Sequence, residues 1–244
     1  MQWRGDAFVL TSRRHGESSA IINVLSRDEG RFAGLVRGGA GKNRRPIIEP
    51  GNRITATWRA RLEEHLGTFD CELVEAHAAR WLGDAIRLGA MSAALGIAAT
   101  ALPEREAHPP IFDGLSILLT SLDGDDWPSV YVKWEMGLLA ELGFGLDLSC
   151  CAATGQTDDL VYVSPKSGRA VSREAGEPYR DKMLPLPRFL CESGRAGSMQ
   201  EVADGLRLTG YFLDSQIYAV SGGELPDARK RFFQRLRKRS AEES

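Results

Sequence analysis

The stretch Arg53-Ile-Thr-Ala-Thr-Trp-Arg-Ala-Arg61 has the clearest periodicity in the chain. Its even positions hold Ile, Ala, Trp and Ala, while its odd positions hold only Arg and Thr. Successive side chains of a β-strand point to opposite faces, so this alternation predicts a strand with one buried face and one wet face. The wet face carries Arg53, Arg59 and Arg61.

Four other apolar runs near this strand also predict strands. They lie at residues 7–10, 20–25, 31–37 and 68–73. The polar cluster at 26–30 is typical of a turn and joins two of these runs into a hairpin. Five strands with no intervening helix predict a small closed or sandwiched β domain at residues 1–76. An OB-like barrel is the leading candidate, because it has five strands and binds single-stranded nucleic acid, and an SH3-like barrel is the alternative.

The strands at 53–61 and 68–73 are expected to pair as a second hairpin with its turn at 62–65. This register places Thr57 opposite Asp70 and Thr55 opposite Glu72. Cross-strand partners of opposite charge stabilise a sheet, so some arginines of this face are expected to pair with acids of the neighbouring strand.

The rest of the chain, residues 77–244, predicts a helical domain, so the whole protein is expected to be α+β. Helical periodicity extends over 75–102, 110–122 and 128–142, and a last helix begins near Pro226. Ser198-Met-Gln-Glu201 is a capping-box signature that opens another long helix. Leu82 and Val220 are expected on the inward faces of the first helix and of this long one.

The pattern changes between about 147 and 190. Leu160-Val-Tyr-Val163 and Arg169-Ala-Val-Ser172 flank a Ser, Pro and Gly turn and predict a β-hairpin embedded in the helical domain. Cys150 and Cys151 precede this hairpin in the manner of half a zinc ribbon. A structural zinc ion needs four ligands, usually two Cys pairs, and the sequence offers no second pair.

Charge is distributed unevenly along the chain. Residues 1–61 contain 12 Lys and Arg against 5 Asp and Glu, whereas the remainder contains 19 against 28. Such a basic segment indicates an anionic partner, commonly nucleic acid. The segment 38–46, Gly-Gly-Ala-Gly-Lys-Asn-Arg-Arg-Pro, predicts a basic loop that could follow phosphates. The candidate DNA contacts are Arg37, Lys42, Arg44, Arg45, Arg53, Arg59 and Arg61.

A second basic cluster occupies the last helix, where seven of the eleven residues 229–239 are Lys or Arg. Phe232 and Leu236 are four residues apart and would dock this helix on the protein. The outward charges could contact DNA, an acidic segment of a partner, or the acidic body of the same chain. The candidate contacts are Arg229, Lys230, Arg231, Arg235, Arg237 and Lys238.

No motif in the sequence predicts catalysis or a cofactor. The segment 38–42 lacks the spacing of a phosphate loop, since Val36 stands where the first glycine is required and Asn43 where a hydroxyl residue is required. Nucleophile-elbow and zinc-protease motifs are absent from the sequence. The four cysteines are too scattered for a disulfide scaffold, and the longest apolar stretch is too short to span a bilayer. These features predict a cytoplasmic protein that is neither an enzyme nor membrane-bound.

The segment Leu148-Ser-Cys-Cys-Ala-Ala-Thr-Gly155, followed by the hairpin at 160–171, resembles the ribbon region of the RecO family of bacterial recombination mediators. The similarity covers nearly the whole chain. It implies a non-enzymatic, nucleoid-associated protein that binds single- and double-stranded DNA and anneals strands coated with single-strand-binding protein. It also implies that RecR is a partner in loading RecA, that the barrel binds DNA, and that the helical domain contacts the acidic tail of single-strand-binding protein.

Some RecO proteins carry a zinc ion on four cysteines, and this sequence departs from that pattern. Cys151 matches one ligand position, whereas Thr154, Ser172 and Ala175 occupy the others. We therefore expect a metal-free ribbon held by packing. Two rival functions are an adaptor that binds acidic protein tails and an RNA-binding OB protein. The wet strand faces have few aromatic residues on which bases could stack, which argues against the RNA-binding function.

Overall fold

The computed structural model describes residues 1–62, 64–192 and 194–242. The chain forms two compact units. The first comprises Met1–Leu119 with Pro226–Arg229, and the second comprises Thr120–Leu225 with Lys230–Ser244. The first unit extends beyond the domain expected at 1–76, because a helix that follows the strands packs against two of them.

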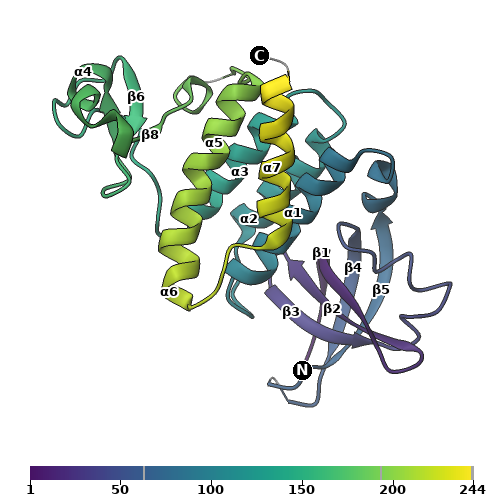
Figure 1. Cartoon of the computed structure of the whole chain (residues 1–244). Helices are drawn as coiled ribbons and strands as arrows, with labels where there is room; N and C mark the ends of the chain where they lie inside the picture. The colour runs from purple at the N-terminus through teal and green to yellow at the C-terminus, as the bar shows by residue number, and fades with distance from the viewer. Residues whose placement is uncertain (63, 193, 243–244) are drawn as a thin grey trace. The chain divides into compact units, whose positions relative to one another are not determined.

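The first unit contains a closed five-stranded barrel with the strand order β1-β2-β3-β5-β4 (Figure 1). The strand β4 pairs back to β1, and the parallel contact between β3 and β5 lies at Leu35 and Thr68. The five expected strands are thereby confirmed. Their bounds are β1 Gln2–His15, β2 Ser19–Ser26, β3 Gly30–Val36, β4 Arg53–Arg59 and β5 Thr68–Glu75.

The expected register of the second hairpin is confirmed, since Thr57 pairs with Asp70 and Thr55 with Glu72. The turn expected at 62–65 includes Glu63, which lies outside the described residues. The first strand is much longer than the apolar run 7–10. Its first half pairs with β4 and its second half with β2, and a register shift follows Val9, so that one bent strand closes the barrel.

The buried face of β4 is the one predicted from its alternation. Ile54 and Trp58 are fully buried in the barrel core, where the rings of Phe32 and Trp58 meet edge-on at 5.1 Å. Trp58 Nε1 donates to Leu66 O at 3.1 Å. Gly67 has a φ of +68°, and a Cβ there would lie 2.4 Å from the indole. Only glycine therefore fits where the chain crosses this ring.

Three helical elements follow the strands, and their bounds differ from the expected helix at 75–102. A short 3₁₀ helix, η1, covers Ala78–Trp81, α1 covers Ala85–Ala101 and α2 covers Pro109–Ser121. Asp84 caps α1, because its side chain accepts the backbone N–H groups of residues 86 and 87. The prediction that Leu82 faces inward was wrong. This residue precedes the cap and is 76% exposed.

The second unit is mainly helical. Its long helices are α3 Trp127–Glu141, α5 Met199–Phe212 and α7 Asp227–Glu242. The capping box is confirmed, since Ser198 Oγ accepts from Glu201 N and Glu201 Oε2 accepts from Ser198 N. The chain continues from α5 through a π-helical segment, Leu213–Tyr218, into α6, Ala219–Ser221. The extra residue per turn changes the helical phase, so Val220, expected inward, is 78% exposed.

The predicted hairpin is confirmed and belongs to a three-stranded sheet. β6 Leu160–Val163 pairs with β7 Ala170–Ser172 on one side and with β8 Leu184–Pro185 on the other. β7 leads into a short helix, α4 Arg173–Gly176. The prolines near 185 concealed β8, which lies at a sheet edge where proline is tolerated.

Thr154 and Ser172, two of the positions expected to correspond to zinc ligands, form hydrogen bonds with Cys151. Ser172 N donates to Cys151 Sγ at 3.3 Å, and Ser172 Oγ lies 3.4 Å from the same sulfur. Burial raises the pKa of this thiol, but hydrogen bonds from Ser172 and Thr154 outweigh it and lower the pKa to about 6. One thiolate with two hydroxyl groups does not fit the ligand set of a structural zinc. In the described ranges no group of three His, Cys, Asp or Glu could hold a metal ion.

Candidate nucleic-acid interface

The basic loop belongs to the connection 37–52 between β3 and β4. In the barrel β5 lies between β3 and β4, so the connection joins two strands that are not neighbours. Its backbone is ordered by successive turns, in which Gly41 N donates to Gly38 O and both Arg44 N and Arg45 N donate to Gly41 O. The buried side chain of Asn52 anchors the far end by donating to Pro46 O at 2.8 Å. The loop arginines are therefore held on a defined turn.

One side of this connection faces an open pocket of about 260 Å³, here called the β4–β5 pocket. It brings together three of the predicted DNA contacts, Arg37 and Arg44 of the connection and Arg59 at the end of β4. Its other lining residues are Thr57, Thr68, Phe69 and Asp70. Three guanidinium groups against one carboxylate make this a site of net positive charge, suited to a phosphate.

The side chains in the β4–β5 pocket have different partners. Arg44 Nη1 lies 2.9 Å from Asp70 Oδ1, and Arg59 Nε donates to Gln2 Oε1 at 3.1 Å. Within the described part of the chain, Arg37 has no acidic partner. Two of the three positive charges are therefore not neutralised by a carboxylate inside the protein.

The remaining predicted contacts of the barrel lie elsewhere. Arg45 lines a separate pocket, whereas Lys42 and Arg61 are exposed and line neither pocket. Arg53 is half-buried, and its Nε donates to both carboxylate oxygens of Asp6 at 3.0 Å. This hydrogen bonding raises the pKa of Arg53. Its guanidinium also lies 6.0 Å from the Phe8 ring, so Arg53 holds parts of the first unit together.

Sequence reasoning missed two residues of these pockets. The apolar run at 7–10 predicts a strand that ends before Arg14, but Arg14 lies near the end of the long β1 and lines the same pocket as Arg45. The adjacent arginines at 13 and 14 were the available signal. Asp70 was predicted to face Thr57 but not to reach into a pocket beside Arg44.

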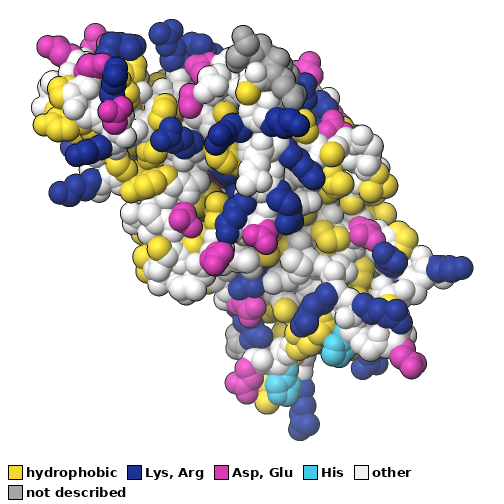
Figure 2. Space-filling view, viewed as in Figure 1, with side chains coloured by type: hydrophobic (Ala, Val, Ile, Leu, Met, Phe, Trp, Pro, Cys, Tyr) yellow, Lys and Arg dark blue, Asp and Glu magenta, His cyan; other side chains and the backbone are white. Residues whose placement is uncertain are grey.

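The last helix, α7, supplies a second basic surface. Phe232 and Leu236 are buried, as expected for a docked helix, and Arg229 is also buried at 1% exposure. Arg229 therefore does not offer a surface to DNA. Lys230 Nζ lies 3.0 Å from Glu224 Oε2. Figure 2 shows basic side chains gathered over this helix, and the exposed ones among the predicted contacts are Arg231, Arg235, Arg237 and Lys238.

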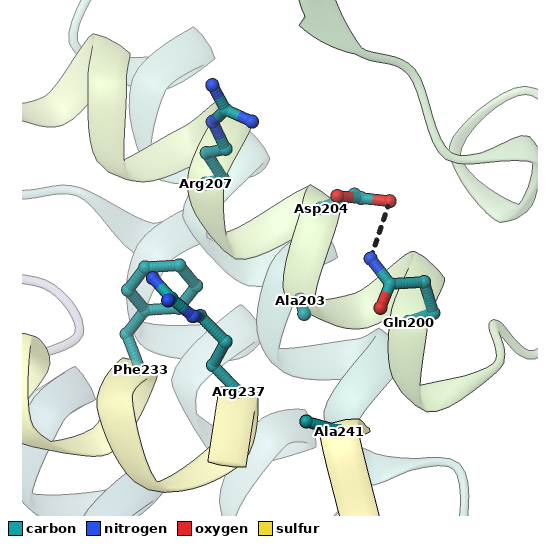
Figure 3. A pocket seen from close by; sticks show the side chains of 7 residues that line it. All are labelled: Gln200, Ala203, Asp204, Arg207, Phe233, Arg237 and Ala241. Atoms are coloured by element: carbon teal, nitrogen blue, oxygen red, sulfur yellow. Dashed lines mark hydrogen bonds between the residues drawn. The ribbon is translucent and has the colours of Figure 1, made fainter. Parts of the chain in front are cut away.

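A groove of about 450 Å³, the α5–α7 groove, lies in the second unit. Figure 3 shows its side chains arranged on the two helices, with those of α5 opposite those of α7. They are Gln200, Ala203, Asp204 and Arg207 on α5, and Phe233, Arg237 and Ala241 on α7. Gln200 Nε2 donates to Asp204 Oδ2 at 3.3 Å, while burial raises the pKa of Asp204. The groove thus combines two arginines, Arg207 and Arg237, with the apolar side chains of Ala203, Phe233 and Ala241.

Both parts of the chain match known protein families. Residues 1–77 match the family described as recombination protein O N terminal, and residues 82–221 match recombination protein O C terminal. The chain belongs to the RecO family. Membership of the RecO family supports a role in DNA repair and recombination.

Relatives named DNA repair protein RecO are similar over nearly their whole length. The protein of Rhodospirillum centenum is 53% identical, with 98% of this chain and 96% of the relative covered. The protein of Mesorhizobium japonicum is 50% identical, with 99% and 96% covered. That of Rhodospirillum rubrum is 47% identical, with 99% and 98% covered.

Both basic pockets of the barrel lie in the part of the chain that matches the N-terminal family. Within the described residues, no helix combines the length and apolar character needed to cross a membrane.

Proposed function

We propose that this RecO-family protein is a recombination mediator that binds single- and double-stranded DNA through its barrel and anneals strands coated with single-strand-binding protein. With RecR it then helps to load RecA. The observation that carries this proposal is the β4–β5 pocket, where Arg37, Arg44 and Arg59 converge beside Asp70. Annealing requires no covalent step, so we propose a binding protein rather than an enzyme. Its proposed location is the cytoplasm, with the nucleoid, where its DNA substrate lies.

An OB-like barrel fits this function. The closed order β1-β2-β3-β5-β4 has the five strands of an OB fold, whose grooves track a nucleic-acid backbone. The ring of Phe69 lines the pocket but is only 4% exposed, so it offers no platform on which a base could stack. Binding therefore depends on phosphate contacts rather than on stacking or sequence, and this supports annealing more than the selective recognition of unpaired RNA.

The test is annealing of complementary oligonucleotides coated with single-strand-binding protein, with and without this protein, over a series of salt concentrations. Acceleration that declines as salt rises is expected, since salt competes with phosphate contacts. Absence of acceleration, with binding to the coating protein retained, would favour an adaptor that recognises acidic protein tails.

The α5–α7 groove is the proposed site for the acidic tail of single-strand-binding protein. Arg207 and Arg237 would pair with its carboxylates, while Phe233 and Ala203 offer an apolar floor. Arg237→Ala should weaken binding of a fluorescent tail peptide about tenfold, as expected for a charge-assisted hydrogen bond. Arg231→Ala is the matched control, because this exposed arginine of α7 lies outside the groove. Equal effects of the two variants would contradict this assignment.

A further inference from the structure

The connection 37–52 contributes residues to two basic pockets of the barrel. One is the β4–β5 pocket. The other, of about 310 Å³ and here called the β1–β2 pocket, is lined by residues of β1, β2 and the connection. They are Ser12, Arg14, Ala20, Gly39, Ala40, Arg45, Glu49 and Pro50.

Backbone contacts define the walls of the β1–β2 pocket. Ala40 N donates to Ser18 O at 2.9 Å, which ties the connection to the turn between β1 and β2. A Cβ on Gly39 would lie 2.9 Å from the Cβ of Ala20, so the glycine permits this close approach. The pocket is thus formed by a fixed backbone rather than by a chance meeting of long side chains.

The charge of the β1–β2 pocket suits an anion. Arg14 donates to Gly16 O at 3.2 Å and to Glu17 O at 2.9 Å, and these neutral acceptors orient its guanidinium without neutralising it. Arg45 is 74% exposed, and its Nε lies 3.5 Å from Glu49 Oε1. Two guanidinium groups therefore face one carboxylate, and the hydroxyl of Ser12 adds a hydrogen-bond donor.

The neighbouring residues Arg44 and Arg45 line different pockets because of the backbone geometry of the connection. Arg44 N and Arg45 N both donate to Gly41 O, so the backbone here has the form of a helical turn. Successive side chains on such a turn diverge by about 100°. Arg44 consequently reaches the β4–β5 pocket and Arg45 the β1–β2 pocket.

We propose that the β1–β2 pocket binds a phosphate of a second nucleic-acid strand, so that one barrel holds two backbones, one in each pocket. This inference rests on the proposed function and adds a second site to it. Occupation of both pockets would hold two strands close to each other while they search for complementary register.

Stoichiometry tests the proposal. The full chain is titrated with an oligothymidylate of about eight nucleotides, within the site size of one OB fold, and sedimentation gives the number of oligonucleotides and chains per complex. Two oligonucleotides per chain are expected. The β1–β2 pocket has two arginines and the β4–β5 pocket three, so the β1–β2 pocket is expected to be the weaker site. Arg45→Ala should abolish this weaker site and leave the tighter affinity unchanged, whereas Arg44→Ala should weaken the tighter β4–β5 site about tenfold. Glu49→Gln should strengthen the weaker site, because it removes the carboxylate beside Arg45.

Arg44→Ala and Arg45→Ala form a matched pair, since both remove one positive charge from adjacent positions of one loop. One oligonucleotide per chain, weakened equally by the two variants, would overturn the two-strand inference and leave the proposed function in place. Failure of the unaltered protein to bind any DNA would overturn the proposed function, and this inference with it.

Discussion

Arg44 Nη1 lies 2.9 Å from Asp70 Oδ1, across a pocket that also holds Arg37 and Arg59. A phosphate that binds Arg44 must compete with this carboxylate. The pair is exposed on both sides, and exposed ion pairs contribute at most about 1 kcal/mol. Asp70 therefore moderates the affinity of the pocket without closing it, which suits a protein that must also release DNA.

Asp70→Asn should increase affinity for single-stranded DNA about two- to fivefold, the range that loss of such a competing pair allows. Fluorescence anisotropy with a labelled oligonucleotide measures this change. Glu72→Gln is the matched control, since it removes the same charge two residues along β5, where Glu72 pairs with Arg4 outside the pocket. If both variants bind equally tightly, net charge rather than competition for Arg44 sets the affinity.

Arg44→Ala should flatten the salt dependence of DNA binding. Each phosphate contact on a single strand contributes about 0.7 to the slope of log affinity against log salt, so the slope should fall by about this amount. Arg4→Ala serves as the control, because Arg4 is an exposed arginine of the same barrel that does not line the pocket. An unchanged slope for Arg44→Ala would remove this residue from the DNA surface.

Gly67→Ala should destabilise the protein more than Gly16→Ala. Both glycines have φ near +65°, a conformation that costs an L-residue about 1–2 kcal/mol. A Cβ at Gly16 meets open space, whereas one at Gly67 would strike Trp58, adding about 1–3 kcal/mol for overpacking. Urea unfolding measures both values. Equal losses would show that Trp58 moves aside without cost.

The stability of the protein should depend on pH through Cys151. Hydrogen bonds from Ser172 and Thr154 lower the thiol pKa to about 6 in the folded state, below its usual value of about 8.5. The bound thiolate therefore stabilises the fold fully above the unfolded-state pKa, and this contribution disappears as pH falls through 6.

The measurement is the urea midpoint of the protein and of Cys151→Ala between pH 5.5 and 9, values chosen to bracket both pKa values of about 6 and 8.5. The difference between the two midpoints should grow with pH. Cys150→Ala controls for the loss of a neighbouring thiol outside these hydrogen bonds. A difference independent of pH would contradict the lowered pKa.

Local patterns predicted the elements whose signals are complete within a few residues. The alternation at 53–61 identified the buried face of β4, and the hairpin expected from the two flanking strands predicted the pairing of Thr57 with Asp70. The capping box at Ser198 identified the start of α5. Each of these predictions depended on neighbours in sequence or on one hairpin.

Long-range packing decided the features that the sequence did not reveal. Val220 is exposed because the π-helical segment after α5 changes the phase of the helix. No residue type in the sequence predicts such a segment. The convergence of Arg37, Arg44 and Arg59 depends on the barrel, which brings the connection 37–52 and the end of β4 to one pocket. Arg53 shares the wet strand face with Arg59, but Asp6 on the neighbouring strand holds it.

The central claim is that phosphate contacts in the β4–β5 pocket drive strand annealing. The most direct measurement compares annealing of coated oligonucleotides by the unaltered protein and by a variant in which Arg37, Arg44 and Arg59 are all Ala. Circular dichroism and unfolding of both proteins check that the barrel remains folded. We expect the variant to anneal strands at close to the rate measured without any added protein. Annealing at the unaltered rate by a folded variant would contradict the claim.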